Sequence, residues 1–199
     1  MPGPTIAELV VGDEPSAWER LGFAVEGDRT TIGTVVVHLA GGGAGLRAWS
    51  LRDVPATDLD GLDTSLAGAP AAQPAEHPNE ALRLDHVVVR TPDLPRTFAA
   101  LEGAGLELRR LREHSDSVHQ GFFRLGEVIL EVVGPPQPSG DEPARFWGLV
   151  AVVPDVDALA AGADPGLFGQ PAAAVQDGRR IVTVRRAAGL SVAFAFITP

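Results

Sequence analysis

The stretch LDHVVVRTPDLPRTFAALEGAG, residues 84–105, decides the fold. It opens with a run of β-branched residues, which favours a strand. Thr91 or Asp93 can then cap a helix, because each offers a side-chain oxygen to the free backbone N–H groups of a first turn. Apolar residues recur at helical spacing after the cap, and Gly103 or Gly105 can end the helix. The stretch therefore predicts a strand followed by a helix.

Three more strands are predicted directly after this helix. The runs are LELRRLREH (106–114), VHQGFFRLG (118–126) and EVILEVVG (127–134), and the last two are joined by a tight turn at Gly126. The order of elements is thus βαβββ.

The same order recurs on both sides of this unit, so the chain is predicted to hold three copies of one βαβββ module. The division expected is a diverged module at 1–53, a Pro-rich linker at 54–81, a module at 82–136 and a third module at 137–199.

The composition excludes several chemistries. The net charge is −10, all 16 basic residues are Arg, and Cys is absent. Schiff-base lysines, phosphate-loop lysines and thiolate sites are therefore excluded. The excess of acid argues against nucleic-acid and membrane partners, which need a basic surface. With no signal-peptide pattern and no long apolar run, a cytoplasmic protein that binds a small molecule is expected.

Strand alternation gathers polar residues of the middle module on one face. Side chains two residues apart in a strand point the same way. His86, Gln120, Arg124 and Glu131 then share one face, and the opposite face is apolar and suits the helix.

The quoted stretches resemble the vicinal oxygen chelate superfamily, which includes glyoxalase I, bleomycin-resistance proteins, methylmalonyl-CoA epimerase and extradiol dioxygenases. The resemblance is carried by LDHVVVRTPDL (84–94) and GFFRLGEVILEVVGPP (121–136), and more weakly by FWGLVAVVPDVDAL (146–159). It implies an α+β fold in which two βαβββ modules pair into a half-open barrel, with modules two and three as the pair. Such modules often assemble across subunits in this family, and a homodimer is compatible with that.

In that family a first-strand His and a last-strand Glu bind a divalent metal on the concave face, and these match His86 and Glu131. Gln120 resembles the amide ligand of the epimerase branch. The three side chains suit Zn, Fe, Mn, Co or Ni. An internal ion pair of Glu131 with Arg124 or Arg90 is the competing interpretation.

The second half of such a site is absent. Gly148 aligns with His86, and Phe194 or Ala195 aligns with Glu131, so the third module offers no ligand. If the first module paired with the middle one instead, Glu8 would match His86, and Trp49 or Ser50 would match Glu131.

Two functions remain open at this point. In the first, the protein is metal-free or nearly so and binds a small molecule in the concave cleft, like a resistance protein. The absent half-site favours this interpretation. The residues expected to touch the ligand are Arg90, Phe122, Arg124, Phe146 and Gly148.

In the second, His86, Gln120 and Glu131 hold a metal for a lyase, isomerase, epimerase or dioxygenase reaction, with Glu8 or Glu127 as base. Retention of both His86 and Glu131 favours it. The sequence leaves open whether the protein is an enzyme, and it does not identify the ligand.

Overall fold

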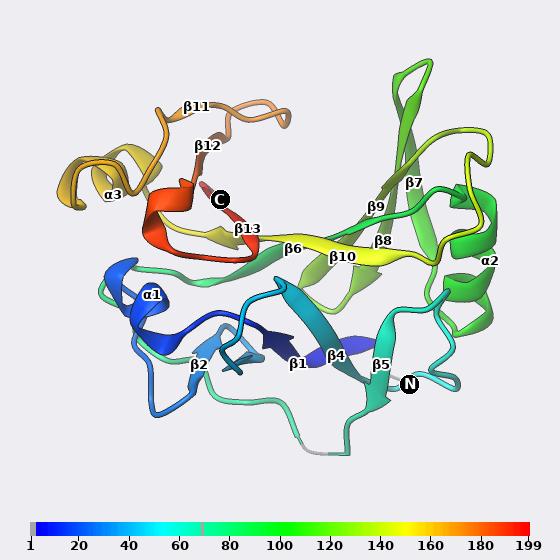
Figure 1. Ribbon diagram of the computed structural model, residues 1–199, viewed down its shortest axis with the longest axis horizontal. Helices are drawn as coiled ribbons and strands as arrows, with labels where there is room; N and C mark the ends of the chain where they lie inside the picture. The colour runs from blue at the N-terminus through cyan, green and yellow to red at the C-terminus, as the bar shows by residue number, and fades with distance from the viewer. Residues whose placement is uncertain (1–2, 69) are drawn as a thin grey trace.

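The computed structural model describes residues 3–68 and 70–199 and consists of two stacked sheets (Figure 1). The larger sheet has eight strands in the order β11-β12-β13-β10-β6-β9-β8-β7, and the smaller has five in the order β2-β3-β1-β4-β5. The larger sheet is open, and both of its ends bend away from the smaller sheet (Figure 1).

The middle module has the predicted order. Its elements are β6 (Arg83–Arg90), α2 (Leu94–Gly103), β7 (Leu108–Ser115), β8 (Val118–Leu125) and β9 (Val128–Gly134). Asp93 caps α2 by accepting a hydrogen bond from the backbone N–H of Arg96. Strand β6 pairs in parallel with β9, so the first and last strands of the module lie side by side.

The third module mirrors the second one. Its elements are β10 (Arg145–Val152), α3 (Val156–Gly162), β11 (Ala172–Ala173), β12 (Arg180–Thr183), the short 3-10 helix η1 (Arg186–Ala188) and β13 (Ala193–Ile197). Strand β10 pairs in parallel with β13 and antiparallel with β6. The α+β fold and the pairing of modules two and three are therefore confirmed.

The N-terminal sheet differs from the prediction in one strand. Its elements are β1 (Thr5–Val11), α1 (Pro15–Arg20), β2 (Arg29–Ile32), β3 (Val35–Leu39), β4 (Leu46–Arg52) and β5 (Asp63–Leu66). Strand β4 was expected to be the last strand of the first module. In the middle module the last strand pairs in parallel with the first, and in the N-terminal sheet it is β3 that pairs in parallel with β1. Strand β4 lies antiparallel to β1, as β10 does to β6. The reason is that residues 23–28 form a β-bridge in place of a full strand, so the unit after α1 is one strand short.

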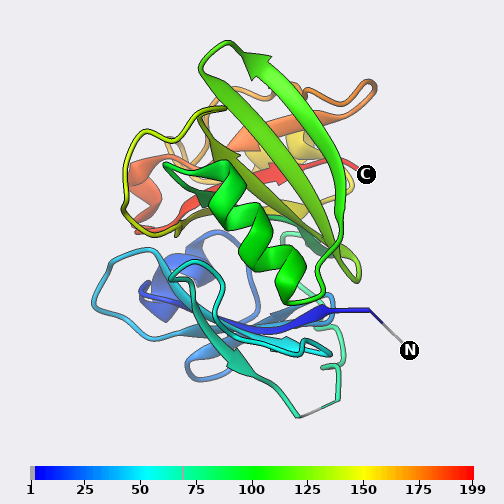
Figure 2. The ribbon, with the colours of Figure 1, turned by 90° about the vertical axis from the view of Figure 1, so that its right-hand side faces the viewer.

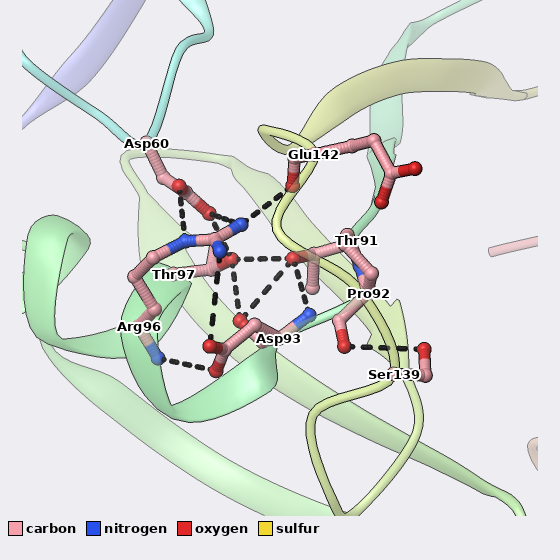
Figure 3. Close-up of polar contacts among 8 residues, drawn as sticks. All are labelled: Asp60, Thr91, Pro92, Asp93, Arg96, Thr97, Ser139 and Glu142. Atoms are coloured by element: carbon pink, nitrogen blue, oxygen red, sulfur yellow. Dashed lines mark hydrogen bonds and ion pairs between the residues drawn. The ribbon is translucent and has the colours of Figure 1, made fainter.

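The predicted linker 54–81 also takes part in the fold. It contains β5, which pairs in parallel with β4, and its Leu59 and Leu62 are buried. Asp60 accepts hydrogen bonds from Arg96 and Thr97 of α2, which ties this segment to the helix (Figure 3).

One continuous core lies between the two sheets. Trp18 packs edge-on against Phe194 of β13, and Trp49 packs edge-on against Phe146 of β10. Helix α2 lies across the strands of the middle module, where Phe98 contacts Phe123 of β8 (Figure 2). The N-terminal sheet and α2 thus cover one face of the eight-stranded sheet, and the opposite, concave face stays open. In the described part of the chain, no helix combines the length and apolarity needed to cross a membrane.

Candidate functional site

Three predicted residues meet on the concave face. The register places His86 opposite Ile129, and Glu131 opposite Val88 on one side and Phe122 on the other. Gln120 of β8 donates a hydrogen bond from Nε2 to Oε1 of Glu131 over 2.6 Å. His86, Gln120 and Glu131 line a single cavity of ≈ 200 Å³. We call this cavity the inner cavity.

Asp85 holds the imidazole of His86, and the sequence analysis missed it. The register shifts between Leu84 and His86, so Asp85 is the extra residue of a β-bulge. The bulge turns its carboxylate toward its own neighbour, and Oδ2 lies 2.7 Å from Nδ1 of His86. The signal available was an Asp–His pair inside an apolar strand. With Nδ1 bonded, Nε2 of His86 is the nitrogen left to bind something else.

Arg179 neutralises Asp85 from the loop between β11 and β12. Its Nη1 and Nη2 lie 3.2 and 3.0 Å from the two oxygens of Asp85, and its Nε donates to the carbonyl of Thr198 over 2.7 Å. Burial raises the pKa of the Asp85 carboxyl, but hydrogen bonds from His86 and Arg179 outweigh it and hold the pKa far below its usual range. Asp85 is therefore ionised.

Glu131 and Gln120 are poorly satisfied by the protein itself. Burial raises the pKa of Glu131, and the charge of His86 and the hydrogen bond from Gln120 only partly offset it. Within residues 3–68 and 70–199, Oε1 of Gln120 is the one buried side-chain oxygen or nitrogen with no hydrogen-bond partner. A buried carbonyl without a partner costs about 1–3 kcal/mol. The inner cavity therefore offers unsatisfied acceptors to a cation or a donor.

The donor set fits a divalent metal. An imidazole nitrogen, an amide oxygen and a carboxylate oxygen would leave positions open for water or a ligand. The described residues contain no group of three or more His, Asp or Glu placed to hold a metal, so a metal here would depend on Gln120 as third ligand.

The third module adds no acidic or imidazole side chain to the inner cavity, and its polar contribution there is Gln176. Pairing of β6 with β10 and of β10 with β13 places Gly148 where the middle module has His86, and Ala195 where it has Glu131. A Cβ at Gly148 would lie 2.9 Å from the carbonyl oxygen of Ala193, so no larger side chain fits there without a shift. The far wall of the inner cavity is apolar and is formed by Val150, Ile181 and Ile197.

A larger cavity of ≈ 840 Å³ adjoins the inner one, and we call it the outer cavity. Four arginines line it, namely Arg109, Arg110, Arg112 and Arg124. Arg109 is paired with Glu107 over 2.9 Å. Among the residues that the structure describes, the other three form no ion pair. The two cavities share His86, Arg112, Phe122, Val175 and Gln176, so they form one cleft.

Three residues expected to touch the ligand, namely Arg90, Phe146 and Gly148, line neither the inner nor the outer cavity. Phe146 packs with its ring centroid 5.2 Å from that of Trp49, between the two sheets. Trp147 forms a second β-bulge, which reverses the face on which Phe146 was expected. Arg90 lies at the far end of β6, outside both cavities. Of the predicted ligand residues, Phe122 and Arg124 line the cleft.

The two proposed bases also lie elsewhere. Glu8 is in the N-terminal sheet and accepts a hydrogen bond from Arg29, so it adds no ligand to the cleft. The position matching Glu131 in that sheet is His38, which pairs with Val10, and not Trp49 or Ser50.

Glu127 accepts hydrogen bonds from the backbone N–H and hydroxyl of Thr34 over 3.0 and 2.8 Å. It lies in the turn before β9, where strand alternation does not apply.

The strand order identifies the class of fold. Two βαβββ modules paired through β6 and β10 form the vicinal oxygen chelate fold, and His86, Gln120 and Glu131 lie on its concave face. No protein-family model and no curated protein matches the sequence.

Similar solved structures include methylmalonyl-CoA epimerases. One, from Mycobacterium tuberculosis, has a TM-score of 0.48 and 14% identity, over 60% of this chain and 89% of that one. Another, from Streptomyces coelicolor in complex with 2-nitronate-propionyl-CoA, has a TM-score of 0.45 and 19% identity, over 59% and 94%. A hypothetical protein from Bacillus halodurans has a TM-score of 0.47 and 14% identity, over 59% and 94%.

Proposed function

We propose that the concave cleft binds an anionic small molecule. Its acidic group would lie in the outer cavity against Arg110, Arg112 and Arg124, and its other end would reach the inner cavity. The observation that carries this proposal is that three arginines without ion pairs, among the described residues, face one cavity in a chain of net charge −10.

The arginines are placed for this role by the strands. Arg110 lies opposite Phe122, and Arg112 lies opposite Gln120, so each guanidinium stands on the same face as the polar residues of the inner cavity. Asp177 also lines the outer cavity, but the arginines outnumber it, so this cavity carries a net positive charge. A positively charged cavity attracts anionic ligands even in an acidic protein, because the nearest charges dominate the local field. Guanidinium groups suit carboxylate and phosphate oxygens, which they bind with two parallel hydrogen bonds.

A second candidate function is metal-dependent catalysis of the lyase, isomerase, epimerase or dioxygenase kind. It is favoured by the partnerless Oε1 of Gln120 beside the half-buried carboxylate of Glu131. A metal held by His86, Gln120 and Glu131 would act as a Lewis acid on a ligand oxygen. The protein's own part would be to fix His86 through Asp85 and to exclude water with the apolar wall of the third module.

Calorimetric titration with carboxylates and phosphate esters tests the anion site. We expect Arg110→Gln, Arg112→Gln and Arg124→Gln each to weaken binding about tenfold or more, since a hydrogen bond to a charged group contributes about 1.5–3 kcal/mol. Arg29→Gln is the control, because Arg29 lies on the other sheet and pairs with Glu8. Equal affinity in all variants would refute the proposal.

Elemental analysis decides between the two candidate functions. Protein purified without chelator or His-tag should contain near-stoichiometric metal if the second candidate is correct, and His86→Ala and Glu131→Ala should lose it. The absence of metal, together with an unchanged unfolding midpoint on adding Mn, Fe, Co, Ni or Zn, would leave the metal-free function.

A further inference from the structure

A separate hollow of ≈ 600 Å³ lies at the opposite end of the concave face, where β6 ends and β10 begins. It shares no lining residue with the inner or the outer cavity. Arg90, Arg145 and Trp147 line it, together with the apolar Val118 and Val133 and one acidic residue, Glu142.

Two like charges face each other across this hollow. Arg90 and Arg145 are direct partners in the antiparallel pairing of β6 with β10. Like charges directly opposite one another in a sheet are destabilising. Across residues 3–68 and 70–199, neither guanidinium has a carboxylate partner within ion-pair distance. The two arginines outnumber Glu142, so this end of the sheet carries a net positive charge that no ion pair among the described residues neutralises.

Trp147 is exposed beside these charges. It is 50% exposed, whereas Trp18 and Trp49 are 0% and 1% exposed. The cause is the β-bulge between Phe146 and Gly148, which makes Trp147 the extra residue that pairs with nothing in β6. The guanidinium carbon of Arg90 lies 5.3 Å from its ring centroid, which is cation–π distance.

We propose that this hollow is a second binding site, for a small planar ring that carries a phosphate or carboxylate. The anionic group would bridge Arg90 and Arg145 and supply the missing negative charge. The ring would stack on Trp147 and bury its exposed face. The site does not depend on the function proposed for the cleft, since the two share no residue.

Tryptophan fluorescence tests this proposal, because Trp147 is the exposed one of the three tryptophans. The probe is phenyl phosphate, with phenol and inorganic phosphate as its two halves. We expect saturable quenching by phenyl phosphate, and at least tenfold weaker binding of either half. Arg90→Gln and Arg145→Gln should each weaken phenyl phosphate binding at least tenfold.

Two controls keep the result interpretable. The unfolding midpoint of Arg145→Gln should equal or exceed that of the wild type, because this variant removes the repulsion, so lost binding would not reflect lost folding. Arg90→Gln removes the same repulsion together with the cation–π contact to Trp147, so its midpoint should stay near that of the wild type. Arg29→Gln, on the N-terminal sheet and outside both the cleft and the hollow, should leave the phenyl phosphate affinity read from Trp147 unchanged. No saturable quenching, or an affinity unchanged by both hollow variants, would overturn the proposal.

Discussion

Arg179 and Asp85, 94 residues apart, form a two-pronged ion pair at 3.0 and 3.2 Å that joins the β11–β12 loop to the floor of the cleft. The same carboxylate holds Nδ1 of His86 at 2.7 Å. Val175 and Gln176, on the loop that Arg179 anchors, line both the inner and the outer cavity. The buried carboxylate of Asp85 therefore determines both the orientation of His86 and the position of one wall of the cleft.

Asp85→Asn should destabilise the protein strongly. The side chains of Asp85 and Arg179 are only 3% and 16% exposed, and removing one partner leaves the other charge buried. Breaking a buried pair costs about 3–5 kcal/mol, which urea unfolding would detect. Asp157→Asn is the matched control, because it breaks an exposed pair with Arg180 and should leave the urea midpoint nearly unchanged. If Asp85→Asn and Asp157→Asn lowered the urea midpoint equally, burial would not be the cause of the larger cost expected for Asp85→Asn.

The difference between wild type and Asp85→Asn should depend on pH. The pKa of Asp85 is lowered in the folded state, so its ionised form contributes stability above the ordinary Asp pKa of about 3.9, and that contribution is lost as the pH falls below it. Urea unfolding at pH 7, 5 and 3 should show a gap that is constant between pH 7 and 5 and smaller at pH 3. A gap of the same size at pH 3 would contradict the assignment.

Glu131→Gln should stabilise the metal-free protein at neutral pH. Burial raises the pKa of Glu131, so its ionised form lowers stability above the ordinary Glu pKa of about 4.3, and protonation relieves this cost as the pH falls. Glutamine keeps the acceptor for Gln120 and removes the charge. Thermal unfolding after dialysis against EDTA should therefore give a higher midpoint for the variant at pH 7, with a smaller advantage near pH 4.

If the inner cavity binds a metal, added metal should give the wild type a higher thermal midpoint than Glu131→Gln. Free metal at 100 times its Kd stabilises a folded protein by about 2.7 kcal/mol. The wild type would gain that amount, and Glu131→Gln would gain less.

Glu127→Ala should weaken the fold and leave ligand binding intact. Glu127 accepts two hydrogen bonds from Thr34, which joins the β8–β9 turn to the N-terminal sheet. Losing them should cost about 1–3 kcal/mol in urea unfolding. Calorimetry with the anionic ligand should give an unchanged affinity, and a large loss of affinity would restore Glu127 as a residue of the cleft.

Gly121→Ala should be destabilising, because a Cβ there would lie 2.3 Å from Cζ of Phe98 on α2. Overpacking of this kind costs about 1–3 kcal/mol. Gly103→Ala, at the end of α2, meets nothing within 4 Å and should stabilise by about 0.4–1 kcal/mol. If both substitutions shift the unfolding midpoint in the same direction, the packing of α2 on β8 is not as described.

Alternation along the sequence predicted the cleft residues correctly where strands run without interruption. His86, Gln120, Phe122, Arg124 and Glu131 all line the cleft. The alternation rule failed at the two β-bulges, where one extra residue changes which side chains point to which face of the sheet. There Asp85 turned toward the cleft floor, and Phe146 turned into the core.

Hydrophobic periodicity and strand alternation are local properties, so the sequence predicted the βαβββ order of the middle and third modules and the three side chains that meet in the inner cavity. The pairing of modules two and three was expected from the family resemblance. Three features are visible only in the folded molecule: β4 lies antiparallel to β1, Arg179 reaches Asp85, and Arg90 faces Arg145. Each of these depends on which distant strand or loop lies alongside. That choice is made by the free energy of burying the whole core, which no short stretch of sequence contains.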